Sequence, residues 1–182
     1  MAQAYIALGS NIGEPTANLT RALAQLAQLG TVSAVSSYYD TAPVGYDDQP
    51  RFVNAACLLE TALPPQDLLI ALKRIEGRLG RTAAVRNGPR VIDLDILLYD
   101  DLVLRTAPLE IPHPRLHERA FVLRPLEEIA PDVRHPLLNQ TVRQLSQATG
   151  QQDVRPLAAD AHSVSPAEAS GGATGGADGP RD

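Results

Sequence analysis

The chain has 182 residues, 44% of them hydrophobic, and a net charge of −5 at pH 7, which fits one domain with an ordinary core. The acidic balance argues against a non-specific nucleic-acid binder, which needs a basic stripe for the phosphate backbone. No apolar run is long enough to span a membrane, and the N-terminus lacks the features of a signal peptide. A soluble, cytoplasmic protein is therefore expected.

Strands and helices are predicted to alternate from the N-terminus. Residues 3–8 read as a short buried strand, and a helix with a leucine stripe follows over about residues 15–29. Between them, Gly9 and Gly13 could let a turn hold a phosphate, but the turn lacks the lysine of a Walker loop, so a structural turn is favoured. A second strand is predicted over residues 31–39.

Residues 40–52 contain two prolines, a glycine and three aspartates, which argue against regular structure. A loop of this length within a small domain is usually functional or disordered. The strand predicted next, over residues 52–61, carries Phe52 and Asn54 on one face and Cys57, expected to be a buried structural thiol, on the other. Asn54 either bonds its own backbone or reads a heterocycle on which Phe52 stacks.

A second helix is predicted over residues 65–79, and a last strand lies within GPRVIDLDILLY, residues 88–99. The resulting order of strand, helix, strand, strand, helix and strand predicts a ferredoxin-like α/β sandwich with a βαββαβ core. Both helices would cover one face of an antiparallel sheet. The other face would be left for a ligand, and short C-terminal helices would complete the fold.

Strict alternation from Val91 places two carboxylates, Asp93 and Asp95, on one face of the last strand, about 7 Å apart along it. The opposite face is expected to be apolar and to contain Ile92, Leu94, Ile96 and Leu98. Adjacent carboxylates repel and pack poorly in a strand. They either solvate an exposed edge or bind a cation such as Mg²⁺.

Arginines near the carboxylate pair favour the second interpretation. Arg90 directly precedes the pair, and Arg81 and Arg86 stand upstream in the polar segment that follows the second helix. A guanidinium binds phosphate oxygens in a bidentate manner. The pattern therefore predicts a site that combines Mg²⁺ with a phosphate.

Downstream, residues 100–108 read as a hairpin or loop, and residues 111–131 concentrate histidines, arginines and one phenylalanine among prolines. His113 and His117 lack a third nearby ligand, which argues against zinc. A short helix is predicted over residues 141–148. From residue 150 large apolar residues are scarce, so we expect a catalytic domain over residues 1–150 and a disordered tail over residues 151–182.

Several blocks, in the same order, resemble the 6-hydroxymethyl-7,8-dihydropterin pyrophosphokinase family of folate biosynthesis. These blocks are ALGSN, SSYYDTAPVG, FVNAA, GPRVIDLDILLY and IPHPRLHERAFVLRPL, and the resemblance spans about residues 3–148. It implies transfer of the pyrophosphoryl group of ATP to the pterin hydroxymethyl oxygen, with release of AMP and with two Mg²⁺ ions. The implied partners are these two small molecules, with no nucleic acid or membrane, and a monomer is expected.

The resemblance also implies roles for individual residues. The Mg²⁺ ligands would be Asp93 and Asp95, and the catalytic residues would be Arg81, Arg90 and Asp95. The ATP site would be lined by Glu76, Arg81, Arg90, Ile96, His113 and Arg119. The pterin would lie between Phe52 and Phe121, with a hydrogen bond to Asn54 and with backbone contacts from Thr41, Pro43 and Val44.

Overall fold

An antiparallel sheet organises the fold in the computed structural model, which describes residues 1–80 and 87–158. Its strands are β1 (Ala2–Ser10), β2 (Thr31–Val35), β3 (Tyr39–Thr41), β4 (Phe52–Thr61), β5 (Asp93–Tyr99) and β8 (Val154–Pro156). The strand order is β5-β1-β4-β3-β8, and β2 also pairs with β4. Every pairing is antiparallel, and the order matches the predicted ferredoxin-like core.

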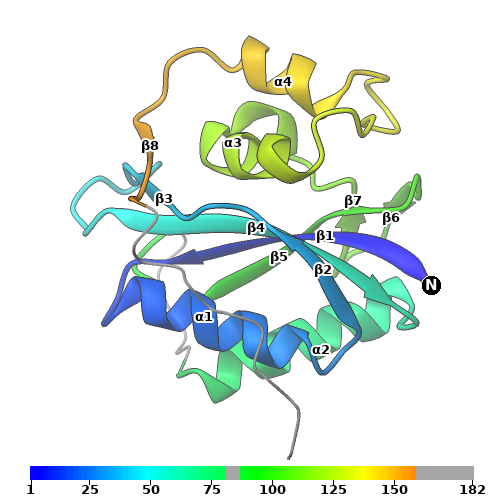
Figure 1. Cartoon of the computed structure of the whole chain (residues 1–182), viewed down its shortest axis with the longest axis horizontal. Helices are drawn as coiled ribbons and strands as arrows, with labels where there is room; N and C mark the ends of the chain where they lie inside the picture. Colours follow the sequence, from blue (N-terminus) through cyan, green and yellow to red (C-terminus); the bar gives the residue numbers. More distant parts are fainter. Residues whose placement is uncertain (81–86, 159–182) are drawn as a thin grey trace, which may run out of the picture.

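Helices cover both faces of the sheet (Figure 1). The helices α1 (Pro15–Leu26) and α2 (Pro65–Arg78) lie on one face, and each has proline in its first turn, where the missing N–H costs nothing. The opposite face is covered in part by α3 (Ala120–Ile129) and α4 (Val142–Ala148). The predicted α/β class is confirmed, and the remaining described elements are a small hairpin of β6 (Leu104–Arg105) and β7 (Glu110–Ile111) and a 3-10 helix, η1 (Leu116–Glu118).

The alternation of β4 divides the interior into two hydrophobic cores. The core under α1 and α2 contains Ala55, Cys57 and Leu59, whereas the core under α3 and α4 contains Ala56. Cys57 is fully buried, as predicted, and burial raises the pKa of its thiol to about 12. The thiol is therefore a core group rather than a nucleophile.

A β-bulge changes the predicted face of one residue at the end of β5. Leu98 pairs with Tyr5 while Ile96 pairs with Ile6, so Leu97 is an extra residue between the two pairs. The extra residue reverses the alternation. Leu97 and Leu98 both enter the core under α3, so the prediction that Leu98 shares a face with Ile96 is wrong.

The helix α3 lies within residues 111–131, where the prolines masked its pattern. Pro125 lies inside the helix and removes one backbone N–H donor. The helix nevertheless forms because Ala120, Leu123 and Leu126 are fully buried against the sheet. Tertiary burial thus outweighs the local cost of the proline.

A strand lies beyond the domain end expected at residue 150. Val154–Pro156 forms β8, which pairs with β3, and the Leu157 side chain packs against the core under α1 and α2. Asp153 accepts two hydrogen bonds from the Arg51 guanidinium, at 2.7 and 3.2 Å. The expectation of a disordered tail from residue 151 is therefore wrong for the strand, and residues 159–182 lie outside the described part.

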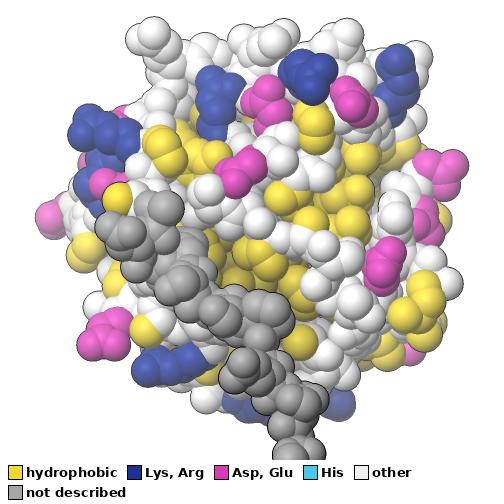
Figure 2. All heavy atoms as spheres, viewed as in Figure 1, with side chains coloured by type: hydrophobic (Ala, Val, Ile, Leu, Met, Phe, Trp, Pro, Cys, Tyr) yellow, Lys and Arg dark blue, Asp and Glu magenta, His cyan; other side chains and the backbone are white. Residues whose placement is uncertain are grey.

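On the molecular face in Figure 2, Lys and Arg side chains are interspersed with Asp and Glu. Between the charged groups lie hydrophobic side chains, in patches rather than as one uninterrupted surface. No helix within residues 1–80 and 87–158 is long and apolar enough to cross a membrane.

Truncation tests whether the β8 segment is part of the folded domain. A chain ending at Gln152 loses the Asp153 ion pair, the β8 hydrogen bonds and the Leu157 contact, so its Tm should fall by about 3–6 °C. A chain ending at Ala158 keeps all three, and its Tm should stay within about 1 °C of the full chain. Equal Tm values for the two truncated chains, measured by calorimetry, would contradict a structural role for β8.

Candidate functional site

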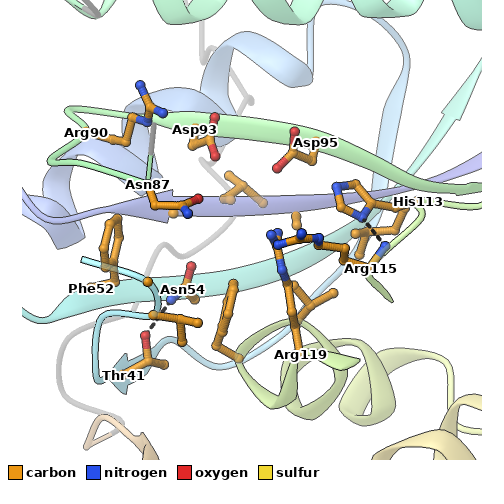
Figure 3. A pocket seen from close by; sticks show the side chains of 18 of the residues that line it. Thr41, Phe52, Asn54, Asn87, Arg90, Asp93, Asp95, His113, Arg115 and Arg119 are labelled. Atoms are coloured by element: carbon orange, nitrogen blue, oxygen red, sulfur yellow. Dashed lines mark hydrogen bonds between the residues drawn. The ribbon is translucent and has the colours of Figure 1, made fainter. Parts of the chain in front are cut away.

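A cavity of about 270 Å³ lies on the sheet face opposite α1 and α2. Its floor comes from β1, β4 and β5, and its walls come from residues 41–45, residues 87–90 and the segment from His113 to Val122. Figure 3 shows Asp93 and Asp95 projecting from β5 into this space, with Phe52, Asn54 and Thr41 toward one end and His113, Arg115 and Arg119 toward the other. Segments distant in sequence thus meet around the carboxylate pair.

The two carboxylates lie on β5 opposite small residues of β1, since Asp93 pairs with Gly9 and Asp95 with Ala7. Burial raises the pKa of Asp95 to about 6, and the neighbouring Asp93 carboxylate adds to this shift. Both causes disfavour the ionised form. A bound cation would remove the repulsion between the two carboxylates, so the pair suits a cation site.

Glu76 supports the carboxylate strand from its other side. The Glu76 side chain is 2% exposed, and its Oε1 accepts a hydrogen bond of 2.8 Å from the backbone N–H of Leu94. Lys73 Nζ also donates to this oxygen, at 3.2 Å. Because β5 is an edge strand, this contact satisfies an N–H that no neighbouring strand could pair.

Arginines at the cavity wall balance the carboxylates. Arg90, Arg115 and Arg119 all line the cavity, and the Arg119 guanidinium forms no hydrogen bond with another described residue. Burial and the neighbouring Arg115 charge lower the pKa of Arg119. These cations, gathered beside carboxylates, are suited to an anionic ligand that arrives with metal ions.

His113 is neutral in this environment. Burial, followed by the Arg119 charge, lowers the pKa of His113 to about 4. Its Nδ1 accepts a hydrogen bond of 3.1 Å from the backbone N–H of Arg115 (Figure 3). Nε2 of the neutral ring therefore carries the proton and can donate a hydrogen bond to a ligand.

An aromatic and amide slot forms the other end of the cavity. Asn54 Nδ2 donates to Thr41 Oγ1 at 2.6 Å. The partner of the amide is therefore another side chain and not the backbone of Asn54 itself. Phe52 lies at this end, and Phe121 also lines the cavity, with the Arg119 guanidinium carbon 5.5 Å from the centre of its ring. The slot can accept a flat, polar ring beside the charged end.

The close approach of Gly9 fixes the position of the Asn54 amide. A Cβ atom at residue 9 would lie 2.6 Å from Asn54 Oδ1 and 4.0 Å from Phe52 Cδ1. Glycine lets the amide lie against β1 without a clash. Gly9 therefore belongs to the floor of the slot, whereas Gly13, with a φ of +71°, lies in the structural turn that was favoured.

Two residues that sequence reasoning missed connect the loops around the cavity. Asn11 Nδ2 donates to Gln49 Oε1 at 2.9 Å and to the Pro50 carbonyl at 3.0 Å, and its Oδ1 accepts from the Arg90 backbone N–H at 2.7 Å. Gln49 Nε2 donates to the Asn87 carbonyl at 2.7 Å. The buried asparagine at the end of β1 was the available signal.

The structure brings most of the predicted site residues together. Those that line the cavity are Thr41, Val44, Phe52, Asn54, Arg90, Asp93, Asp95, His113, Arg119 and Phe121. Glu76 and Ile96 lie away from it, and Ile96 belongs to the core under α1 and α2. Pro43 does not line the cavity, and Arg81 and Arg86 lie outside the described residues.

The donor set suits Mg²⁺ better than a transition metal. No group of three or more His, Cys, Asp or Glu side chains within the described residues could hold a metal by itself. Mg²⁺ commonly takes one or two carboxylates and completes its coordination with phosphate oxygens and water. Asp93 and Asp95 provide these carboxylates, so metal and phosphate would have to bind together.

Comparison with known proteins relates the chain to one family. The family model for 7,8-dihydro-6-hydroxymethylpterin-pyrophosphokinase (HPPK) matches residues 5–131. The chain is 52% identical over 132 residues to 2-amino-4-hydroxy-6-hydroxymethyldihydropteridine pyrophosphokinase of Bacillus subtilis, covering 71% of this chain and 79% of that protein. It is 43% identical over 141 residues to a folic acid synthesis protein of Dictyostelium discoideum, covering 78% of this chain.

The chain spans 22% of the Dictyostelium protein, so that relative is much longer. Among solved structures, wild-type Plasmodium falciparum HPPK-DHPS has a similar fold, with a TM-score of 0.62 and 18% identity. The similarity covers 81% of this chain and 43% of the Plasmodium chain. At this identity the structural likeness establishes the shared fold alone.

The raised pKa of Asp95 predicts how metal-free stability depends on pH. The pKa of Asp95 rises from 3.8 to about 6 on folding, so the folded protein favours the protonated carboxyl. The contribution of this group to stability is complete below pH 3.8 and is lost as the pH rises through 6. Asp95→Asn should therefore raise the free energy of unfolding by about 1–2 kcal/mol at pH ~7.5 and by almost nothing near pH ~4. Urea denaturation in EDTA, with exposed Asp101→Asn as control, measures this. A gain independent of pH would contradict the assignment.

Proposed function

The chain belongs to the 7,8-dihydro-6-hydroxymethylpterin-pyrophosphokinase family, and on this basis we propose that it acts in folate biosynthesis as an ATP- and Mg²⁺-dependent pyrophosphokinase. It transfers the pyrophosphoryl group of ATP to the hydroxyl of 6-hydroxymethyl-7,8-dihydropterin and releases AMP. The observation that carries this proposal is a single cavity in which a carboxylate pair, three arginines and an aromatic slot with an amide converge.

The pterin occupies the slot at the Phe52 end of the cavity. Phe52 and Phe121 stack on the flat ring, and Asn54 accepts a ring N–H through Oδ1, because its Nδ2 already donates to Thr41. Backbone groups of Thr41, Pro43 and Val44 complete the contacts. The ring is thereby oriented with its hydroxymethyl arm toward Asp95.

The ATP phosphates lie beside the carboxylate pair, between Arg90 near the Phe52 end and Arg119 toward the other end. Arg90 and Arg119 hold phosphate oxygens, and neutral His113 donates one hydrogen bond without adding charge. Arg81, which lies outside the described residues, is proposed as a further phosphate ligand. Glu76 acts indirectly, because its hydrogen bond to Leu94 holds the carboxylate strand in place.

Asp93 and Asp95 would hold the Mg²⁺ ions, which would neutralise charge at the phosphates and lower the pKa of the pterin hydroxyl. The hydroxyl oxygen forms a bond to the β-phosphorus of ATP while the bond from that phosphorus to the oxygen that bridges it to the α-phosphorus breaks. The electron pair leaves with AMP, and the hydroxyl proton is released to solvent. Positioning of the two substrates and charge stabilisation account for most of the rate.

Analysis of products tests the proposed reaction. The protein is mixed with ATP, Mg²⁺ and 6-hydroxymethyl-7,8-dihydropterin, and both products are identified by mass spectrometry. A pterin that gains pyrophosphate, formed together with AMP, supports the proposal. A pterin that gains one phosphate, formed with ADP, shows a different phosphotransferase, and an unchanged pterin contradicts the assigned substrate.

The carboxylate role is checked in the same assay. Asp95→Asn should lower kcat by at least about 100-fold, because it removes a charge that stabilises the transition state through the metal. Exposed Asp101→Asn serves as the matched control and should retain normal kcat. Folded Asp95→Asn protein with near-normal kcat would exclude the carboxylate mechanism.

Gly9→Ala separates the pterin slot from the phosphate end. The new Cβ would lie 2.6 Å from Asn54 Oδ1, so the amide must move, and pterin affinity should fall by about tenfold as one oriented hydrogen bond is lost. Affinity for an ATP analogue should change by less than about twofold, since the atoms nearest the new Cβ belong to Asn54 and Phe52 and not to an arginine. Gly77→Ala, with open space around it on α2, is the control. Unchanged pterin affinity in Gly9→Ala, measured by titration calorimetry, would place the pterin elsewhere.

A further inference from the structure

Arg119 occupies a helix position that it cannot stabilise with its own side chain. It is the N-cap residue of α3, where Ser, Thr, Asp or Asn would normally accept a hydrogen bond from a free backbone N–H. A guanidinium can only donate, and the Arg119 side chain reaches into the cavity instead (Figure 3). A cation at a helix N-terminus is also unfavourable toward the helix dipole. The first turn of α3 therefore needs an acceptor from elsewhere.

Gln152 supplies that acceptor from the C-terminal segment. The backbone N–H of Ala120 donates to Gln152 Oε1 at 3.0 Å, and Gln152 Nε2 donates to the Glu118 carbonyl at 3.1 Å. Ala120 and Glu118 are the two chain neighbours of Arg119. One side-chain amide thus forms hydrogen bonds with the backbone on both sides of Arg119, and both its oxygen and its nitrogen have a partner.

The segment that carries Gln152 is itself anchored on the pterin side of the cavity. The carbonyl of Asp153 accepts from the Ala42 N–H at 3.0 Å, and its carboxylate accepts from the Arg51 guanidinium. Arg51 Nε in turn donates to Asp40 Oδ1 at 2.9 Å. Gln152 therefore connects the backbone around Arg119 to the β3 edge of the sheet rather than to a free chain end.

We propose that Gln152 is a positioning residue that holds Arg119 in the orientation required to bind a phosphate group. The identity of that group as a phosphate of ATP rests on the proposed function. Gln152 lies outside residues 5–131, which the family model matches. Preorganising a long, flexible arginine reduces the ordering that ligand binding would otherwise require.

Binding of the non-hydrolysable analogue α,β-methylene-ATP, in the presence of Mg²⁺, tests the proposal by titration calorimetry on the full chain. Gln152→Ala should weaken binding by about threefold to tenfold, since Arg119 must then be ordered by the ligand. Gln151→Ala changes the same residue type at the neighbouring position, which is exposed like Gln152, and should bind normally. Gln152→Glu keeps the acceptor for Ala120 and should recover part of the affinity. If Gln152→Ala fails to fold, Gln152→Glu is the variant compared with the wild-type protein.

A double-mutant cycle with Arg119→Ala distinguishes positioning from a general structural effect. If Gln152 acts through Arg119, adding Gln152→Ala to Arg119→Ala should weaken binding by less than about twofold further. The same loss in both backgrounds, or normal binding by Gln152→Ala, would overturn the proposal. The cycle reads analogue binding alone, so a wild-type protein that fails to make pterin pyrophosphate would refute the proposed function while leaving this test valid.

Discussion

The Asp93 and Asp95 carboxylates lie on one face of an edge strand, and their mutual repulsion is the constraint on which the rest of the site depends. Burial raises the pKa of Asp95, so the ionised pair is costly unless cations are near. The fold places arginines at the cavity wall. On the other side of β5, Glu76 accepts a hydrogen bond from the backbone N–H of Leu94 at the edge of the sheet. Much of the site architecture can be understood as the support of two ionised groups until metal and phosphate bind.

The sheet face opposite α1 and α2 forms the site at one end and a hydrophobic core at the other. Toward Gly9 the face carries the carboxylates and the amide slot, whereas the bulge at Leu97 turns two consecutive leucines into the core under α3. That core holds α3 against the sheet and thereby places Arg119 and Phe121 at the cavity wall. Packing energy gained at one end of the face thus fixes the geometry of polar groups at the other end.

Local patterns were sufficient for much of the fold. Period-two alternation located β4 and the carboxylates, and proline marked the start of both helices under the sheet, although α1 ends at Leu26, before the end predicted at residue 29. The bulge at Leu97 depends on pairing with β1, which no local pattern encodes. Likewise α3 tolerates Pro125 because of tertiary burial, and β8 forms because Asp153 reaches Arg51, distant in sequence. The roles of Asn11, Gln49 and Gln152 were missed because their partners also lie far away along the chain.

Carboxyl-carbon NMR of Asp95 tests the central claim, that this pair is a cation site, most directly. Without metal, the Asp95 pKa should lie at about 6. With saturating Mg²⁺ and α,β-methylene-ATP, it should fall below about 4, because a bound cation favours the ionised carboxylate. An Asp95 pKa that stays at about 6 with both ligands saturating would contradict the assignment of this carboxylate to the metal site.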